Sequence, residues 1–208
     1  MANIKNYYEL VKNTKVRNPG FKNHGLEIPF YSLIIGSSGS GKTNILLQFL
    51  SLSNNTFTKI VICLKNKDEP LYNLLENQCP EIEFYENGEI PDISDFNNSK
   101  MSLIVFDDLV LSKDQSKIQE YFIRARKKNI SCIYLSQSYY RIPKLIRINA
   151  RYIIIKKLAS QKDLNLVVSE YSLGNKDDIL KIYQNATKQF TDFLLIDTFN
   201  NSFKMNFN

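Results

Sequence analysis

The sequence predicts a three-layer α/β fold, in which helices cover both faces of a mainly parallel central sheet. Short apolar runs alternate along the chain with segments of helical character, which is the pattern of such a sheet. The 208 residues suit one domain of ordinary size, and 43% of them are hydrophobic, which is enough for a substantial core. Glycine, aspartate and a Ser-Gln pair directly follow three of the apolar runs. Ligands of parallel sheets bind at that edge, so we expect one site there.

The elements follow from the length and composition of each segment. Residues 1–28 are polar and weakly patterned, so we expect an N-terminal arm before a domain at 29–199 and a polar tail at 200–208. The predicted strands are Phe30–Ile35, Lys59–Leu64, Ile82–Tyr85, Leu103–Phe106, Ile130–Leu135, Tyr152–Ile155 and Phe193–Ile196. The predicted helices begin at Lys42, span Leu71–Glu76 and Asp114–Lys128, follow Pro143, and occupy 160–189 in two pieces divided at Gly174.

A glycine-rich segment between the first strand and the first helix matches the pattern G-x-x-x-x-G-K-[ST] of a phosphate-binding loop. Glycines let the backbone approach phosphate oxygens, and the amides and helix N-terminus then face negative charge. We expect Lys42 to reach the β- and γ-phosphates and the Thr43 hydroxyl to bind Mg²⁺. The predicted ATP-binding residues are Gly36, Ser37, Ser38, Gly39, Ser40, Gly41, Lys42, Thr43 and Asn44. The sequence therefore predicts a P-loop NTPase.

Two carboxylates end the apolar strand at Leu103–Phe106. Asp107 suits the magnesium shell of a Walker B site. Asp108 is a candidate to orient and activate the attacking water, which requires hydrogen-bond reach of that water. The alternative is a strand end with acidic turn residues. Gln137, just after the strand Ile130–Leu135, is a further candidate to sense the γ-phosphate and position water; its alternative is an ordinary surface residue.

Hydrolysis also requires a cation near the γ-phosphate, and the candidates are Arg124 and Arg126 near the end of the helix Asp114–Lys128 together with Arg141, Arg147 and Arg151. That helix runs back from the carboxyl edge of the sheet, so Arg124 and Arg126 lie too far from their own nucleotide. We therefore predict that Arg126 acts in trans on the nucleotide of a neighbouring subunit. The alternative is a solvated helix end, where positive charge also suits the helix dipole.

Charge is unevenly distributed in this chain of net charge +6. Residues 113–162 hold 13 Lys or Arg against two acidic residues, and residues 65–95 hold nine acidic residues against two Lys. Such polarity suits contact with nucleic acid or with a neighbouring subunit, and solvated surfaces are the plain alternative. Three widely spaced cysteines and a single histidine favour reduced thiols and no zinc site. No apolar run reaches the length of a membrane span.

The ordered motifs resemble one family in particular. Beyond the two Walker motifs, Arg126-Lys-Lys-Asn-Ile130 leads into Tyr134-Leu-Ser-Gln-Ser138 and Arg141-Ile-Pro143. This arrangement over residues 30–156 resembles the genome-packaging ATPases of large eukaryotic DNA viruses and virophages, within the FtsK–HerA superfamily. The resemblance implies an additional strand between the P-loop strand and the Walker B strand. It also implies catalytic roles for Lys42, Asp107, Asp108, Gln137 and Arg126.

The resemblance further implies a homo-oligomeric ring, a pentamer or hexamer, that hydrolyses ATP and drives double-stranded DNA into a preformed capsid. A capsid or portal-region protein would be a partner, and the host cytoplasm (the viral factory) and the virion would be its locations. Basic loops around Tyr139–Arg147 are candidates for DNA contact, and the alternative for Tyr139 and Tyr140 is a core or interface position. Alternatives remain: another DNA-translocating or helicase-like FtsK–HerA ATPase, a small-molecule kinase or GTPase, and a nucleotide-gated assembly protein with little hydrolysis.

Overall fold

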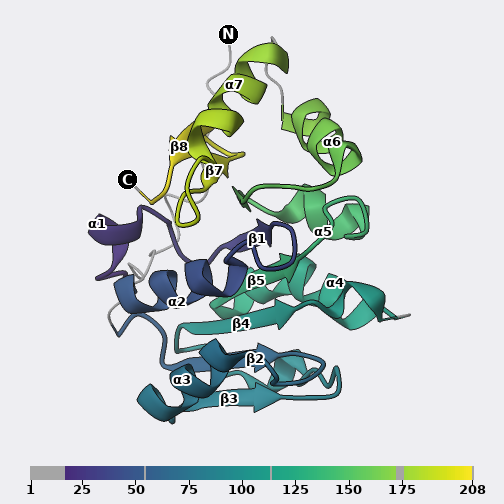
Figure 1. Cartoon of the computed structure of the whole chain (residues 1–208). Coiled ribbons are helices and arrows are strands. Elements are labelled where there is room, and N and C mark those ends of the chain that lie inside the picture. Colours follow the sequence, from purple (N-terminus) through teal and green to yellow (C-terminus); the bar gives the residue numbers. More distant parts are fainter. Residues whose placement is uncertain (1–16, 54, 113, 172–175, 208) are drawn as a thin grey trace, which may run out of the picture.

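The computed structural model describes residues 17–53, 55–112, 114–171 and 176–207. Its strands are β1 (Tyr31–Ile35), β2 (Lys59–Cys63), β3 (Ile82–Tyr85), β4 (Ser102–Asp107), β5 (Ile130–Ser136), β6 (Tyr152–Ile155), β7 (Leu194–Asp197) and β8 (Ser202–Met205). Its α-helices are α1 (Phe21–His24), α2 (Lys42–Leu52), α3 (Pro70–Gln78), α4 (Ser116–Arg124), α5 (Lys144–Asn149), α6 (Gln161–Tyr171) and α7 (Lys176–Ala186). The alternation of strands and helices is as predicted (Figure 1).

The described residues form one sheet with the strand order β3-β2-β4-β5-β1-β6-β7-β8. Pairing is parallel from β3 through β6 and antiparallel for β6–β7 and β7–β8. Strand β5 lies between the P-loop strand β1 and the Walker B strand β4, which confirms the predicted additional strand. Because β1, β4 and β5 are parallel, the residues that follow them meet at one edge of the sheet.

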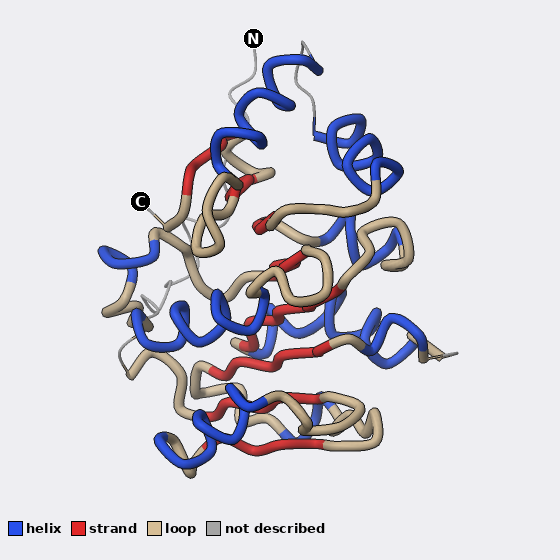
Figure 2. Tube along the Cα trace, viewed as in Figure 1, coloured by secondary structure: helices blue, strands red, loops and turns tan. Residues whose placement is uncertain are grey.

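Helices cover both faces of the sheet, which confirms the three layers (Figure 2). Alternate residues of each strand point to opposite faces, so Leu33 and Ile34 of β1 belong to different hydrophobic cores. One core includes apolar residues of α4, α5, α6 and α7, and the other includes residues of α2 and α3. Each helix is thus fixed to the sheet by burial of its apolar face.

The structure differs from the predicted elements in one helix and in the C-terminal tail. The helix expected at Asp114–Lys128 is α-helical only over Ser116–Arg124 and then tightens into a 3₁₀ turn at Ala125–Lys128. That turn ends at Asn129, whose left-handed backbone (φ 56°) reverses the chain into β5. The predicted polar tail contains β8, which pairs with β7 along its whole length, and Phe207, which is buried against Phe193. This edge strand was not predicted from the sequence, because its residues mix polar and apolar side chains and form no apolar run.

The predicted N-terminal arm, residues 1–28, is described by the structure only from residue 17 onward. Residues 1–16 lie outside the described part of the chain. Within residues 17–28, helix α1 packs beside α2, and Leu26 is buried in the same core as Phe49. No helix within the described ranges has the length and apolar character needed to cross a bilayer.

Candidate nucleotide-binding site

The P-loop connects β1 to α2 at the carboxyl edge of the sheet. Gly41 has a left-handed backbone (φ 91°) immediately before the first residue of α2. This conformation is disfavoured for residues that carry a Cβ atom. Gly36 is required for a different reason, because a Cβ there would lie 2.6 Å from the Cβ of Lys156. Both glycines therefore fix the loop's path between the sheet and the N-terminus of α2, where backbone amides favour an anion.

Lys42 lies folded back over its own loop. Its Nζ donates to the carbonyl oxygens of Gly36 (3.0 Å) and Ser37 (3.1 Å). Burial lowers the pKa of Lys42, while Asp107, Asp108 and Glu69 oppose that shift by favouring the ammonium form. The ammonium group is thus held at the loop where the phosphates of a nucleotide would enter, which is the position that the motif predicts.

Asp107 ends β4 at the same edge and is linked to α3. The Tyr72 hydroxyl donates to Asp107 Oδ2 at 2.6 Å and also interacts with the Thr43 side chain. Burial raises the pKa of Asp107 to about 6, although the Tyr72 hydrogen bond and Lys42 act in the opposite direction. One phenolic hydroxyl therefore touches the Thr43 and Asp107 side chains together, which shows that these two oxygen donors converge.

The converging donors fit a magnesium ion chemically. Hydroxyl and carboxylate oxygens are hard ligands, and Mg²⁺ in nucleotide enzymes is held by one or two protein oxygens together with phosphates. Tyr72 was not identified from the sequence, because nothing in its local segment distinguishes it from a core tyrosine. It is only 1% exposed, and its ring also packs against Phe84 at 5.9 Å between centroids.

Asp108 and Gln137 form a second pair at the edge. Gln137 Nε2 donates to Asp108 Oδ2 at 2.9 Å, and both residues are exposed. Asp108 has a left-handed backbone (φ 50°), which directs the chain away from β4, and its amide donates to the carbonyl of Leu135 (3.2 Å). Strands β4 and β5 are neighbours, so the two candidates for positioning water lie side by side, as their places after predicted strands suggested.

Arg126 lies at the opposite edge of the sheet. Its backbone N–H donates to the hydroxyl of Tyr31, the first residue of β1, at 2.8 Å, and its side chain is exposed. Gly36 follows the other end of the same strand. Five residues of extended chain separate the two edges by roughly 17 Å. Arg126 is thus not gathered into this site with Lys42 and Asp107.

The loop predicted to contact DNA is partly buried. Tyr139 is 0% exposed, and its hydroxyl pairs with the Tyr171 hydroxyl at 2.6 Å. Arg147 stacks on the Tyr139 ring at 5.0 Å and forms an ion pair with Glu170 at 2.9 Å. The expectation of DNA contact is therefore wrong for Tyr139 and Arg147, because both have protein partners. The solvent-facing members of this loop are Tyr140, Arg141 and Lys144.

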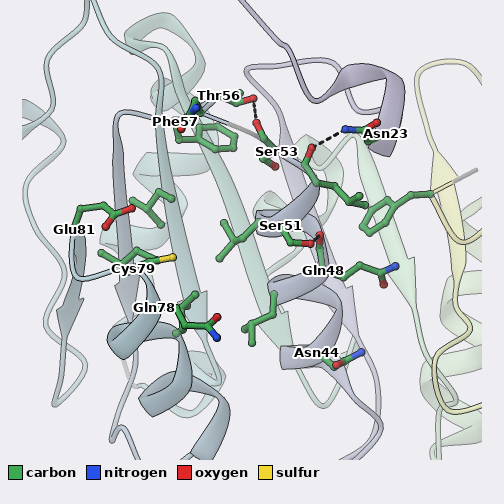
Figure 3. Close-up of a pocket in the computed structure, with 18 of the residues that line it drawn as sticks. Asn23, Asn44, Gln48, Ser51, Ser53, Thr56, Phe57, Gln78, Cys79 and Glu81 are labelled. Atoms are coloured by element: carbon green, nitrogen blue, oxygen red, sulfur yellow. Dashed lines mark hydrogen bonds between the residues drawn. The ribbon is translucent and has the colours of Figure 1, made fainter.

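Two pockets flank the carboxylates and the loop. A pocket of about 870 Å³ beside the Walker B end is lined by four carboxylate residues, Asp68, Glu69, Asp107 and Asp108. A larger pocket of about 940 Å³ runs along the outer side of α2 and past the end of α3. Figure 3 shows Asn44, Gln48 and Ser51 of α2 lining this larger pocket, with mostly uncharged groups around them. Asn44, which was predicted to bind nucleotide, lies in the first turn of α2 next to the P-loop and also lines that larger pocket.

Comparison with known proteins identifies the family. The family model of the Poxvirus A32 protein matches residues 20–199. The chain belongs to the Poxvirus A32 protein family. This confirms the resemblance to packaging ATPases of large eukaryotic DNA viruses. No curated protein matches the chain at the sequence level.

Solved structures with the same fold extend the comparison. The genome packaging NTPase B204 of Sulfolobus turreted icosahedral virus 2, in complex with ATP-gammaS, aligns with a TM-score of 0.63 and 14% identity over 87% of this chain and 98% of its own. The DNA-packaging ATPase B204 of Sulfolobus turreted icosahedral virus aligns with a TM-score of 0.63 and 17% identity, over 86% and 97% of the two chains.

A third solved structure comes from outside viruses. The conjugation coupling protein TcpA of pCW3, a monomer with ATPgS, aligns with a TM-score of 0.59 and 15% identity over 86% of this chain and 59% of its own. At these identities the likeness shows the fold. The A32 family member described here therefore shares the fold of the B204 NTPases and of TcpA.

Proposed function

We propose that this A32 family member is an ATP-hydrolysing motor that translocates double-stranded viral DNA into a preformed capsid. One observation carries the proposal: the P-loop with Lys42 and the acidic ends of β4 meet at one edge of the sheet. Family membership and the fold of the B204 packaging NTPases support it, and one of those was solved with ATP-gammaS.

The chemistry follows from the residues at the edge. The P-loop amides and Lys42 bind and orient the β- and γ-phosphates, and the Thr43 and Asp107 oxygens hold Mg²⁺. Mg²⁺ held there by Thr43 and Asp107 would supply positive charge that offsets the negative charge of the phosphates. Asp108 and Gln137 are exposed and hydrogen-bonded to each other, so they orient a water for in-line attack.

Arg126 then acts between subunits of a ring. It lies a strand length from its own P-loop and is exposed to solvent, as is Arg124. The pocket lined by Asp68, Glu69 and the Walker B carboxylates is an acidic entrance for a neighbour's arginine. Mixing Arg126→Ala chains with Lys42→Ala chains tests this, because each can supply what the other lacks. Recovery of ATPase activity supports action in trans; no recovery in demonstrated mixed rings contradicts it.

DNA contact is assigned to the exposed groups of the basic segment. Tyr140, Arg141 and Lys144 face solvent, and cations of this kind grip phosphates without reading sequence. Affinity for duplex DNA would then fall steeply as salt rises. The ring, a pentamer or hexamer, would dock on a capsid or portal-region protein, in viral factories of the host cytoplasm and in the virion.

The deciding experiment is an ATPase assay with and without double-stranded DNA, on wild type and Lys42→Ala. A motor hydrolyses faster with DNA, and Lys42→Ala abolishes the activity. Equal rates with and without DNA contradict the motor, and nucleotide binding without hydrolysis indicates an assembly protein. A blunt-duplex translocation assay separates packaging from a helicase-like or conjugation-type pump, which the likeness to TcpA makes the second candidate.

A further inference from the structure

A small pocket lies on the side of the P-loop away from the carboxylates. It has a volume of about 310 Å³ and is lined by residues 37–40 of the P-loop, 156–159 after β6, and 187–190 before β7. These segments meet because β6 is the neighbour of β1 on the side opposite β5. The Ser37 amide donates to the Lys157 carbonyl (3.3 Å), and the Ala159 amide donates to Ser37 Oγ (2.7 Å). The pocket is therefore tied directly to the phosphate-binding loop.

Phe190 places an exposed aromatic ring at this pocket. The ring is 64% exposed, yet a Cβ on Gly41 would lie 3.1 Å from its Cζ atom, so the ring contacts the P-loop backbone. A solvent-facing phenylalanine gives up the free energy that burial would provide. Neither of the two hydrophobic cores formed by the described residues includes Phe190. Its position is therefore not explained by core packing.

A buried lysine holds the segment that carries this ring. Lys156 is 2% exposed, and its Nζ donates to the carbonyl of Phe190 and to that of Asp192 (2.7 Å). Its ammonium group also lies 5.5 Å from the centre of the Phe190 ring. Burying an ammonium group is costly unless polar atoms satisfy it, and here two carbonyls do so. The ring is thus fixed beside the loop before any ligand arrives.

The two sides of the P-loop differ in what they can bind. On the β4 and β5 side, carboxylates and an amide suit metal, phosphate and water, and the apolar surface of the pocket there comes from aliphatic side chains such as Leu109 and Leu111, because its one aromatic residue, Tyr72, is buried. On the β6 side, Phe190 and Leu158 supply apolar surface, while Thr187 and Gln189 line the same pocket with polar groups. A nucleobase stacks on a flat aromatic face and bonds through a polar edge, and of these two pockets only the one on the β6 side has an exposed aromatic ring.

We propose that Phe190 is the stacking platform for the base of the nucleoside triphosphate. The inference rests on the proposed function, since it places the base of the nucleotide whose phosphates the P-loop holds. Stacking of a base on an aromatic side chain contributes about 1–3 kcal/mol, a term that the triphosphate alone cannot provide.

The experiment compares binding of two ligands that share a triphosphate but differ in the base. Dissociation constants for ATP and for inorganic tripolyphosphate, both with Mg²⁺, are measured on wild type, Phe190→Ala, Phe190→Leu and Phe190→Tyr. The matched control is Phe199→Ala, which removes another phenylalanine that is 76% exposed. The stacking assignment predicts about tenfold weaker ATP binding for the Ala and Leu variants, with tripolyphosphate unchanged. Phe190→Tyr and Phe199→Ala should bind both ligands as wild type does.

The possible results separate the two proposals. Equal weakening of ATP and tripolyphosphate in the Ala and Leu variants overturns the inference, because Phe190 would then only support the loop. Unchanged ATP binding in those variants overturns it too. A wild-type protein that binds both ligands with equal affinity lacks a base site, which contradicts the inference while leaving the P-loop intact. Failure of wild type to bind either ligand removes the proposed function itself.

Discussion

The two sides of the P-loop differ in the kind of side chain that lies beside it. The carboxylate side, which comprises Asp107, Asp108, Gln137 and Tyr72, is a hydrogen-bonded arrangement at the ends of two neighbouring strands. The aromatic side, which comprises Lys156 and Phe190, is a ring held on a loop by a buried ammonium group. Rigid polar groups suit chemistry that depends on precise placement, whereas a stacking ring needs only area and orientation. Changes on the carboxylate side should therefore alter hydrolysis more than affinity.

The largest effect is expected for Asp107→Asn. Loss of the carboxylate removes a charged oxygen donor for Mg²⁺, so kcat should fall by about a hundredfold or more while nucleotide still binds. Steady-state hydrolysis together with a nucleotide-binding titration measures both quantities. Asp178→Asn on the exposed surface of α7 is the control and should behave as wild type. Normal hydrolysis by Asp107→Asn would contradict the assignment of the metal site.

A smaller effect is expected for the pair Asp108 and Gln137. Each alanine substitution should lower kcat by about 10- to 100-fold, since each removes one group that orients water. Because Gln137 Nε2 donates to Asp108 Oδ2 at 2.9 Å, the double variant should lose much less than the product of the two single losses. A double-mutant cycle on kcat measures this coupling. Fully multiplicative losses would show that the two residues act independently.

A modest effect is expected for Tyr72→Phe, which keeps the ring and removes only the hydroxyl. Asp107 then loses the donor that orients it, so the Mg²⁺ concentration for half-maximal activity should rise by about three- to tenfold. A magnesium titration of the ATPase rate measures the shift. Tyr121→Phe is the matched control, because its buried hydroxyl donates to the Pro91 carbonyl away from the site (3.1 Å). An equal shift in both variants would point to a general loss of stability.

Substitution of His24 should not alter hydrolysis at neutral pH. His24 lies in α1, beside the end of α2 that is farther from the P-loop. Burial lowers the pKa of His24 from 6.5 to about 4. The unfolded chain therefore binds the proton more tightly, so this residue's contribution to stability is complete above pH 6.5 and is lost as the pH falls toward 4. The contribution is about 3 kcal/mol at most.

Unfolding by urea at a series of pH values tests the His24 contribution. Between pH 6.5 and 4, wild type should lose more unfolding free energy than His24→Gln, because only wild type carries the imidazole. The Leu26 amide donates to His24 Nδ1 at 3.0 Å, so a lower baseline stability of the variant is expected at every pH. Parallel pH profiles for the two proteins would show that His24 does not titrate in this way.

The carboxylate side could be predicted because its members follow apolar strands in the sequence. Gly36 and Gln137 directly follow strands and Asp107 ends one, and parallel strands bring their carboxyl ends to one edge. Tyr72 could not be predicted, because a tyrosine on an amphipathic helix is usually a core residue and its partner lies 35 positions away. The strand β8 was missed because an edge strand with mixed polarity has no apolar run to mark it.

The sequence by itself determined the fold class, the position of the P-loop and the chemistry of the carboxylate end, because these depend on local periodicity and on residue types at strand ends. Only the tertiary structure decided that Tyr139 is buried, that Arg147 pairs with Glu170, and that Phe190 lies against Gly41. The physical reason is range: strands and loops form from neighbouring residues, whereas contacts such as the one between Gly41 and Phe190 depend on how the whole sheet is ordered.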